Sequence, residues 1–147
     1  MPWPGQLFPH GGGRVVFDVG MTRWRDREFR PNPAPAVGTA SRTLLRLRVA
    51  GHDIVLRRTR IAPGGTSGWH YHDGTLFVVV TRGVLDHPYL ERGPAEYPRF
   101  HVFREPSGPA NAHVARNGGP TETRILVLYL NPANSPLSHS VPPPTDG

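Results

Sequence analysis

Apolar residues in this chain occur in short runs that are separated by Gly, Pro and polar residues. The run TLLRLRV at residues 43–49 alternates apolar and polar positions, which is typical of a strand with one buried face. The other apolar runs are RVVFDV, DIVLRRTRIA, TLFVVVTRG, RFHVFRE and TRILVLYL. Residues 19–29 carry a weak helical pattern and could form one short helix. Many short strands with turns between them predict an all-β sandwich or barrel.

Three segments do not follow this pattern, because they are too rich in Pro and Gly for regular structure. They are residues 1–13, residues 30–41 and the final NPANSPLSHSVPPPTDG. We therefore divide the chain into an N-terminal arm with a possible edge strand (1–41), a barrel (42–131) and an extended or disordered tail (132–147). The arm would either lie at the periphery or cover a sheet edge or a dimer partner. A chain of 147 residues suits one domain.

Composition excludes several classes of site. The chain has no cysteine, which excludes disulfides, thiolate metal ligands and a cysteine nucleophile. No apolar run reaches the roughly 18 residues of a membrane span, and no secretion leader is recognisable, so we expect a cytoplasmic protein without a membrane partner. All 17 basic residues are arginine, which together with 18 Pro and 17 Gly is typical of a GC-rich, bacterial genome.

The net charge of +6 raises the question of nucleic-acid binding. The arginines are scattered, however, and no helix-turn-helix or zinc-finger spacing accompanies them. We therefore expect no nucleic-acid partner and a small, anionic substrate instead. Arg58 and Arg60 share one face of a predicted strand. If that face points inward they are candidate catalytic residues that hold an anion, and if it points outward they are solvated.

Two histidines one residue apart stand out in GGTSGWHYHDG. On a strand His70 and His72 point to the same side, while Trp69 and Tyr71 point to the other. Burying two unpaired imidazoles would be costly, which favours a shared metal ion over a pair of core residues. A second cluster, EPSGPANAHVARN, contains His113.

These two clusters resemble the two sequence motifs of the cupin superfamily. The first motif matches at Gly64, His70, His72 and Gly83. The second matches at Pro106, Gly108, His113 and Asn117, except that four residues rather than two separate Gly108 from His113. An insertion in a turn can be accommodated. The resemblance covers residues 57–130.

The resemblance implies a cupin jelly-roll β-barrel with a divalent metal ion held by His70, His72 and His113. Fe(II) is the metal that we expect, and Zn, Ni, Cu and Mn also suit imidazole ligands. The alternative is a metal-free cupin whose histidines line a pocket. Asn117 is expected to fix its own turn through backbone hydrogen bonds.

The carboxylate that cupins usually carry after the second histidine is missing here, because those positions are Leu76 and Phe77. Glu91 and Glu105 remain as stand-ins for a fourth ligand. We expect instead three neutral ligands, which leave the metal its full charge and open positions for water or substrate. Three-histidine cupins that cleave diketones or oxidise thiols with iron and O₂ have a similar site.

The remaining candidates are assigned less directly. Tyr129, on a late strand, could donate a hydrogen bond to a substrate or belong to the core. His101 either lines the pocket or lies on the surface. The apolar pocket wall is predicted to be Phe77 and Val79, or Leu76 and Val78 in the other register. The histidines expected to be ordinary solvated residues are His10, His52, His87 and His139.

The sequence therefore predicts a metal-dependent cupin enzyme acting on a small organic acid or an enolisable carbonyl compound. The leading hypothesis is an Fe(II)/O₂ dioxygenase, an oxidoreductase. The alternatives are a non-oxidative isomerase, cyclase or lyase that uses the metal as a Lewis acid, and a non-catalytic ligand-binding cupin. We also expect a homodimer to which the N-terminal arm contributes.

Overall fold

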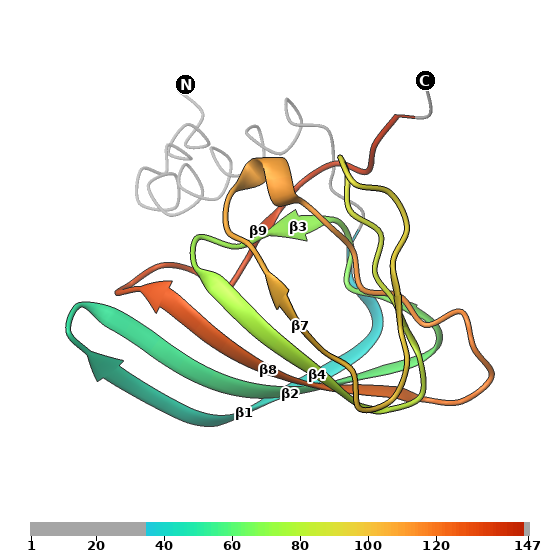
Figure 1. Cartoon of the computed structure of the whole chain (residues 1–147), viewed down its shortest axis with the longest axis horizontal. Helices are drawn as coiled ribbons and strands as arrows, with labels where there is room; N and C mark the ends of the chain where they lie inside the picture. Colours follow the sequence, from blue (N-terminus) through green and yellow to red (C-terminus); the bar gives the residue numbers. More distant parts are fainter. Residues whose placement is uncertain (1–34, 146–147) are drawn as a thin grey trace, which may run out of the picture. The chain divides into compact units, whose positions relative to one another are not determined.

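The computed structural model describes residues 35–145, and within them the chain is almost entirely β (Figure 1). The strands are β1 (Val37–Val49), β2 (His52–Thr66), β3 (His70–Tyr71), β4 (Thr75–Arg82), β5 (Leu85–Asp86), β6 (Glu96–Tyr97), β7 (Val102–Glu105), β8 (Thr123–Pro132) and β9 (His139–Ser140), with one 3-10 turn, η2 (Pro109–Asn111). The helix predicted at 19–29 lies outside the described residues. Across residues 35–145 we find no helix that is long and apolar enough to cross a membrane.

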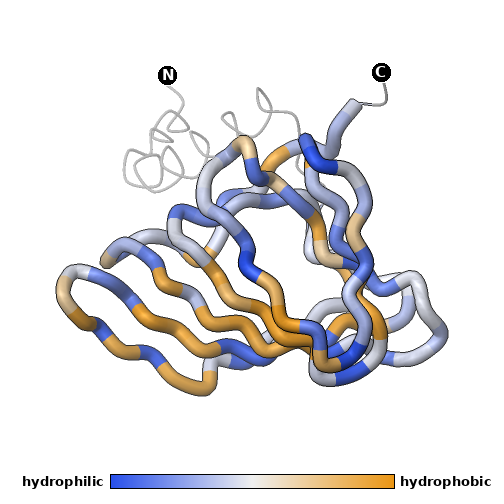
Figure 2. The backbone as a smooth tube through the Cα atoms, viewed as in Figure 1, coloured by the Kyte–Doolittle hydropathy of each residue, from blue (hydrophilic) through white to orange (hydrophobic). Residues whose placement is uncertain are grey.

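Five strands form one antiparallel sheet in the order β1-β2-β8-β4-β7. Apolar and polar residues alternate along β2 and β8 in Figure 2, and the inner face of these strands supplies the core. β1 also alternates, but Leu45, Leu47 and Val49 are exposed, so the buried face predicted for residues 43–49 does not occur in the described chain. The core side chains from β2, β4 and β8 are Val55, Ile61, Leu76, Val78, Val80, Ile125, Val127 and Tyr129. Each fully buried Val, Leu or Ile stabilises the fold by about 1.5–3 kcal/mol. The predicted all-β barrel is confirmed.

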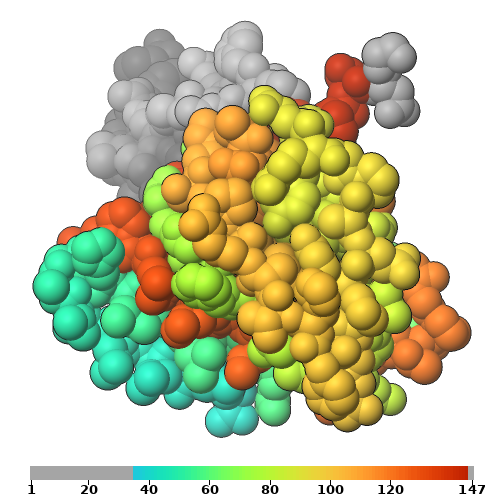
Figure 3. All heavy atoms as spheres, in the orientation of Figure 1, coloured from blue at the N-terminus to red at the C-terminus, as the bar shows by residue number. Residues whose placement is uncertain are grey.

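A second layer of short strands faces this sheet. It contains the pairs β3-β9 and β5-β6, and single bridges connect these to residues 112–117. In the space-filling view the segments coloured yellow and orange, which include β7 and η2, pack directly against each other (Figure 3). Asn117 holds the second layer to β2, because its side-chain amide donates to the carbonyls of Ile61 and Thr121. The prediction that Asn117 fixes its own turn is confirmed.

The boundary predicted between arm and barrel falls inside a strand. β1 begins at Val37, and Ala40 and Ser41 pair with β2 as regularly as the residues that follow them. The Gly that suggested an irregular segment forms a bulge instead. Gly38 has a φ of +66°, which a residue with a side chain rarely adopts, and the register shifts there. β1 is an edge strand of the sheet, while residues 1–34 of the proposed arm lie outside the described residues.

Part of the tail predicted to be extended or disordered packs on the barrel, whereas residues 142–145 are exposed and form no regular structure. Residues 139–140 form β9 and pair with β3, and the backbone N–H of Val141 donates to the carbonyl of Trp69. Leu137 packs against the core. Sequence reasoning could not predict β9, because a two-residue strand in a Pro-rich segment has no periodicity to recognise.

Candidate metal centre

Three histidines from separate elements meet between the two layers. His70 lies on β3, His72 follows it, and His113 lies after η2. His70 and His113 exchange both backbone hydrogen bonds, each with an N–O distance of 2.9 Å. Ring nitrogens of the three residues all lie within 4.8 Å of one another. The structure therefore brings together the three residues predicted to bind a metal ion.

Hydrogen bonds fix how each ring presents its nitrogens. In all three histidines Nδ1 lies against a backbone carbonyl, so Nδ1 carries the proton and donates it. The acceptors for His70, His72 and His113 are the carbonyls of Gly68, Leu137 and Asn111, at 2.8, 2.6 and 2.8 Å, respectively. Nε2 is then the unprotonated nitrogen, as in metal-binding histidines that are oriented by a second hydrogen bond.

Two further observations fit a metal ion. Nε2 of His113 is buried and has no hydrogen-bond partner, which is unfavourable unless the nitrogen binds a ligand. Burial, together with the neighbouring His113 and His72, lowers the pKa of His70 to about 3. The imidazole is therefore neutral at physiological pH, and this is the form that binds metals.

The insertion in the second motif has a structural role. The extra residues between Gly108 and His113 form η2, which spans Pro109–Asn111. The last of these residues provides the carbonyl that accepts the Nδ1 proton of His113. The longer turn thus helps to orient the third histidine.

Glu105 supplies a carboxylate to this centre. It is buried at the end of β7, and its Oε2 lies 3.3 Å from Nε2 of His72 and 3.3 Å from Nε2 of His113. Ligands that each lie about 2.1 Å from one metal ion are about 3.0–3.4 Å apart in octahedral or tetrahedral geometry. The oxygen therefore lies where a fourth ligand would, and three neutral ligands are not the arrangement that the structure favours. Glu91, the other stand-in, is exposed in a loop.

The protonation state of Glu105 agrees with this position. Burial raises the pKa of this carboxyl, but the close ring nitrogens of His113 and His72 and the hydrogen bond from His87 outweigh it and hold the pKa well below its usual range. Glu105 is thus a carboxylate, enclosed by imidazoles.

His87 was predicted to be solvated, and this is wrong. It is almost fully buried, and its Nε2 lies 2.8 Å from Oε1 of Glu105. Its ring also stacks on that of His113, with 4.5 Å between centroids. His87, Glu105 and His113 form a second group with metal-ligand geometry that overlaps the first. A single histidine in a loop carries no spacing signal, so sequence reasoning could not have found it.

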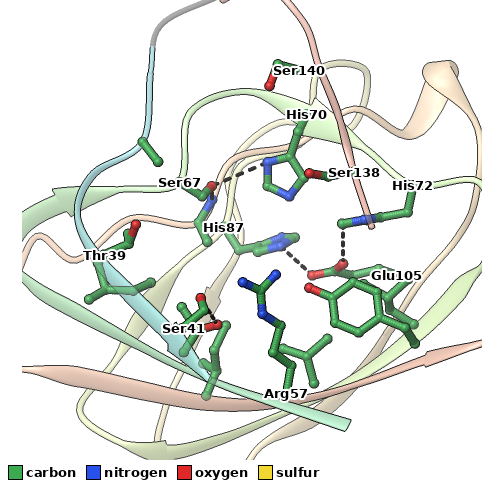
Figure 4. A pocket seen from close by; sticks show the side chains of 18 residues that line it. Thr39, Ser41, Arg57, Ser67, His70, His72, His87, Glu105, Ser138 and Ser140 are labelled. Atoms are coloured by element: carbon green, nitrogen blue, oxygen red, sulfur yellow. Dashed lines mark hydrogen bonds and ion pairs between the residues drawn. The ribbon is translucent and has the colours of Figure 1, made fainter. Parts of the chain in front are cut away.

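A cavity of about 260 Å³ opens beside the histidines (Figure 4). His70, His72, His87 and Glu105 line one side of it. Its apolar lining includes Leu76 and its polar lining includes Tyr129, as the sequence suggested. Both side chains are buried.

Other predicted pocket residues lie elsewhere. Phe77 is exposed and Val79 points the same way, because side chains alternate along β4 and Leu76 and Val78 take the inner face. The register with Leu76 and Val78 inward is the one that occurs. His101 is exposed and stacks on Tyr97, so it does not line the pocket.

The two predicted catalytic arginines point outward. Arg58 and Arg60 share the outer face of β2, and Arg60 forms an ion pair with Glu122 at 2.7 Å. The preceding residue, Arg57, points inward instead and lines the cavity. The sequence left open which face of this strand points inward. In the structure it is the face of Arg57, not the face of Arg58 and Arg60.

No protein-family model and no curated protein matches this sequence. Solved structures do match. The polyketide cyclase RemF from Streptomyces resistomycificus is 22% identical over 76% of this chain and 76% of its own, with a TM-score of 0.60. A cupin-2 domain protein from Rhodospirillum rubrum is 16% identical over 78% and 72%, with a TM-score of 0.61. The DMSP lyase DddQ from Ruegeria pomeroyi DSS-3 is 15% identical over 67% of this chain and 49% of its own, with a TM-score of 0.57.

Proposed function

We propose that this cupin-fold protein is a metal-dependent enzyme that acts without oxygen on a small, enolisable carbonyl compound or organic acid. The ligands are His70, His72, His113 and Glu105. The observation that carries the proposal is the cluster of three oriented histidines, of which His72 and His113 each have Nε2 at 3.3 Å from one carboxylate oxygen of Glu105. Nitrogen and oxygen donors of this kind suit Zn(II), Fe(II) and similar divalent ions.

Two comparisons favour non-oxidative chemistry over the dioxygenase hypothesis. Of the similar structures named above, two have a named reaction, a cyclase and a lyase, and neither name denotes an oxidoreductase. A divalent ion in this position supplies Lewis acidity towards a carbonyl or carboxylate oxygen. The reaction class that we propose is therefore isomerisation, cyclisation or elimination.

Tyr129 is the residue that we propose as proton donor. Its ring meets that of His72 edge-on with 5.7 Å between centroids, and its side chain lines the cavity. Burial raises the pKa of Tyr129, so the hydroxyl keeps its proton at neutral pH. A neutral phenol beside the ligands can donate a hydrogen bond, or its proton, to a substrate oxygen.

The apolar part of the cavity limits access of water. Ile61, Ile125 and Val127 line it beneath the polar groups, and all three are buried in the core. Water exclusion strengthens the electrostatic interactions of the site and protects a reactive substrate.

The first test is metal content. Protein purified without added metal should contain about one divalent ion per chain by elemental analysis, and His70→Ala and His113→Ala should each lose it. His52→Ala is the matched control, because His52 is exposed and lies outside the cluster. Full metal content in both cavity variants would rule out this centre.

The second test separates the reaction classes. Zn(II)- and Fe(II)-loaded protein should exchange the α-protons of small keto acids for deuterium under argon, as followed by NMR. Tyr129→Phe should slow this exchange while metal content stays unchanged. Turnover that requires both Fe(II) and O₂ would favour the dioxygenase hypothesis instead. Ligand binding without any turnover would indicate a non-catalytic cupin.

A further inference from the structure

Arg57 is a cation on the inner face of the main sheet. In the register of that sheet it lies between Thr43 on β1 and Val127 on β8, and Val127 belongs to the core. Its side chain rises from β2 into the cavity in the direction of the histidines (Figure 4). Placing an arginine on a core-facing position is unfavourable unless the charge is compensated.

No such compensation comes from the described part of the chain. The carboxylates of residues 35–145 that pair with arginine take Arg48, Arg60, Arg82, Arg116 and Arg124, and none pairs with Arg57. Glu105, the carboxylate of the cavity, is surrounded by histidines. Nε of Arg57 is buried and has no hydrogen-bond partner among the described residues. A buried guanidinium nitrogen without an acceptor costs free energy, which an anion from outside would recover.

The surroundings of Arg57 are polar in a way that suits an oxygen-rich anion. Thr59 and Ser41, on neighbouring strands, line the same part of the cavity, and their hydroxyls lie 2.8 Å apart. Tyr129 is close enough that the charge of Arg57 counters the effect of burial on its pKa. The cavity therefore has a metal-ligand side, an apolar floor and a second polar side centred on one cation.

We propose that Arg57 binds an anionic oxygen of the substrate, and that the substrate is a small acid with a second oxygen donor for the metal centre. This deepens the proposed function and rests on it, because the second donor needs the metal. A planar guanidinium can bind both oxygens of a carboxylate at once, which orients the substrate as well as attracting it. Dicarboxylates and keto acids have the required pair of groups, whereas neutral carbonyl compounds lack the anion.

The test uses malonate as the probe and malonamide as its neutral counterpart. Affinity is measured by calorimetry on full-length, Zn(II)-loaded protein, after its metal content has been determined. Wild type should bind malonate and not malonamide. Arg57→Met should weaken malonate binding about tenfold or more at unchanged metal content, because a charge-assisted bond is lost. Arg57→Lys keeps the positive charge but loses the planar guanidinium, so its malonate affinity should lie between those of wild type and Arg57→Met.

Arg58→Met is the matched control, since it removes the same charge one position away on the outer face. It should bind malonate within about twofold of wild type, because exposed charges contribute little at physiological salt. Equal malonate affinity in wild type, Arg57→Met and Arg58→Met would overturn the role of Arg57, as would metal-loaded wild type that binds no malonate. Wild type that binds no metal would instead overturn the proposed function. Thermal melts of the two Arg57 variants identify any loss due to unfolding.

Discussion

Glu105 on β7 lies directly opposite Leu76 on β4, and both side chains point into the barrel. Leu76 is one of the two positions at which the resembled cupin motif has its glutamate. The carboxylate is therefore present at nearly the same place but comes from the neighbouring strand. Opposite residues of an antiparallel pair lie about 4.5–5.5 Å apart, so either strand can reach the same point.

This relationship predicts that the carboxylate can be moved from one strand to the other. Glu105→Leu should lower Zn(II) affinity about tenfold or more, since an anionic ligand is lost. Adding Leu76→Glu to it should restore much of that affinity, as measured by competition with a chromophoric chelator. Glu122→Leu is the control, because Glu122 lies outside the centre and pairs with Arg60. A double variant no better than Glu105→Leu would contradict the interpretation.

His87 should act by holding Glu105 in place. It donates from Nε2 to Oε1, the oxygen that does not face the other two histidines. His87→Phe keeps an aromatic ring but leaves Oε1 without a donor, and should reduce Zn(II) affinity about 10–100-fold. His87→Gln retains a donor and should recover part of the loss. His139→Phe is a matched control, because His139 pairs with the carboxylate of Asp73 outside the centre. Similar losses in the Phe and Gln variants would argue against a positioning role.

The outer face of the main sheet predicts self-association. Leu45, Leu56, Leu128 and Phe77 are successive partners across β1, β2, β8 and β4, and they point away from the cavity. The neighbouring Leu47 is also exposed, at 47%. An apolar sheet face is self-complementary about a two-fold axis, which suits the expected homodimer.

Light scattering at tens of micromolar should therefore give about twice the chain mass for wild type and a lower mass for Leu47→Glu. Leu90→Glu tests whether any exposed leucine would have the same effect, because Leu90 is 45% exposed but lies in the loop after β5. Monomeric wild type would refute the predicted dimer. A dimer that Leu47→Glu leaves intact would place its interface elsewhere.

Glu122 should make part of the stability depend on pH. Hydrogen bonds from Arg60 and Arg124 lower its pKa from 4.5 to about 2. A carboxyl whose pKa is lowered in the folded state stabilises that state above its unfolded pKa, and the contribution is lost as pH falls towards the folded value. The difference in urea midpoint between wild type and Glu122→Gln should thus be largest near neutral pH and shrink between pH 4.5 and about 2. The effect should be small because the group is exposed, and a difference that grows on acidification would contradict it.

Local sequence was enough to predict the longer strands and the three histidines that meet in the cluster. Alternation with a period of two identified 43–49, and an apolar run identified 123–130, because side chains on a strand point to opposite faces and apolar ones favour burial. His70 and His72 were found for the same reason, since the i, i+2 spacing puts both rings on one side. His113 was found because its surroundings matched a motif. The longer turn before it still places its ring next to those of His70 and His72.

The tertiary structure decided which residues from other strands complete the site. Alternation says that Arg57 and Arg58 face opposite ways, but only the packing of β2 between β1 and β8 says which one faces the cavity. Glu105 and His87 are 18 residues apart and meet through the fold, with no pattern that joins them. The tail supplies the Leu137 carbonyl to His72 across 65 residues. Such contacts depend on strand order and register, which are set by the burial of the whole core and not by any local run of residues.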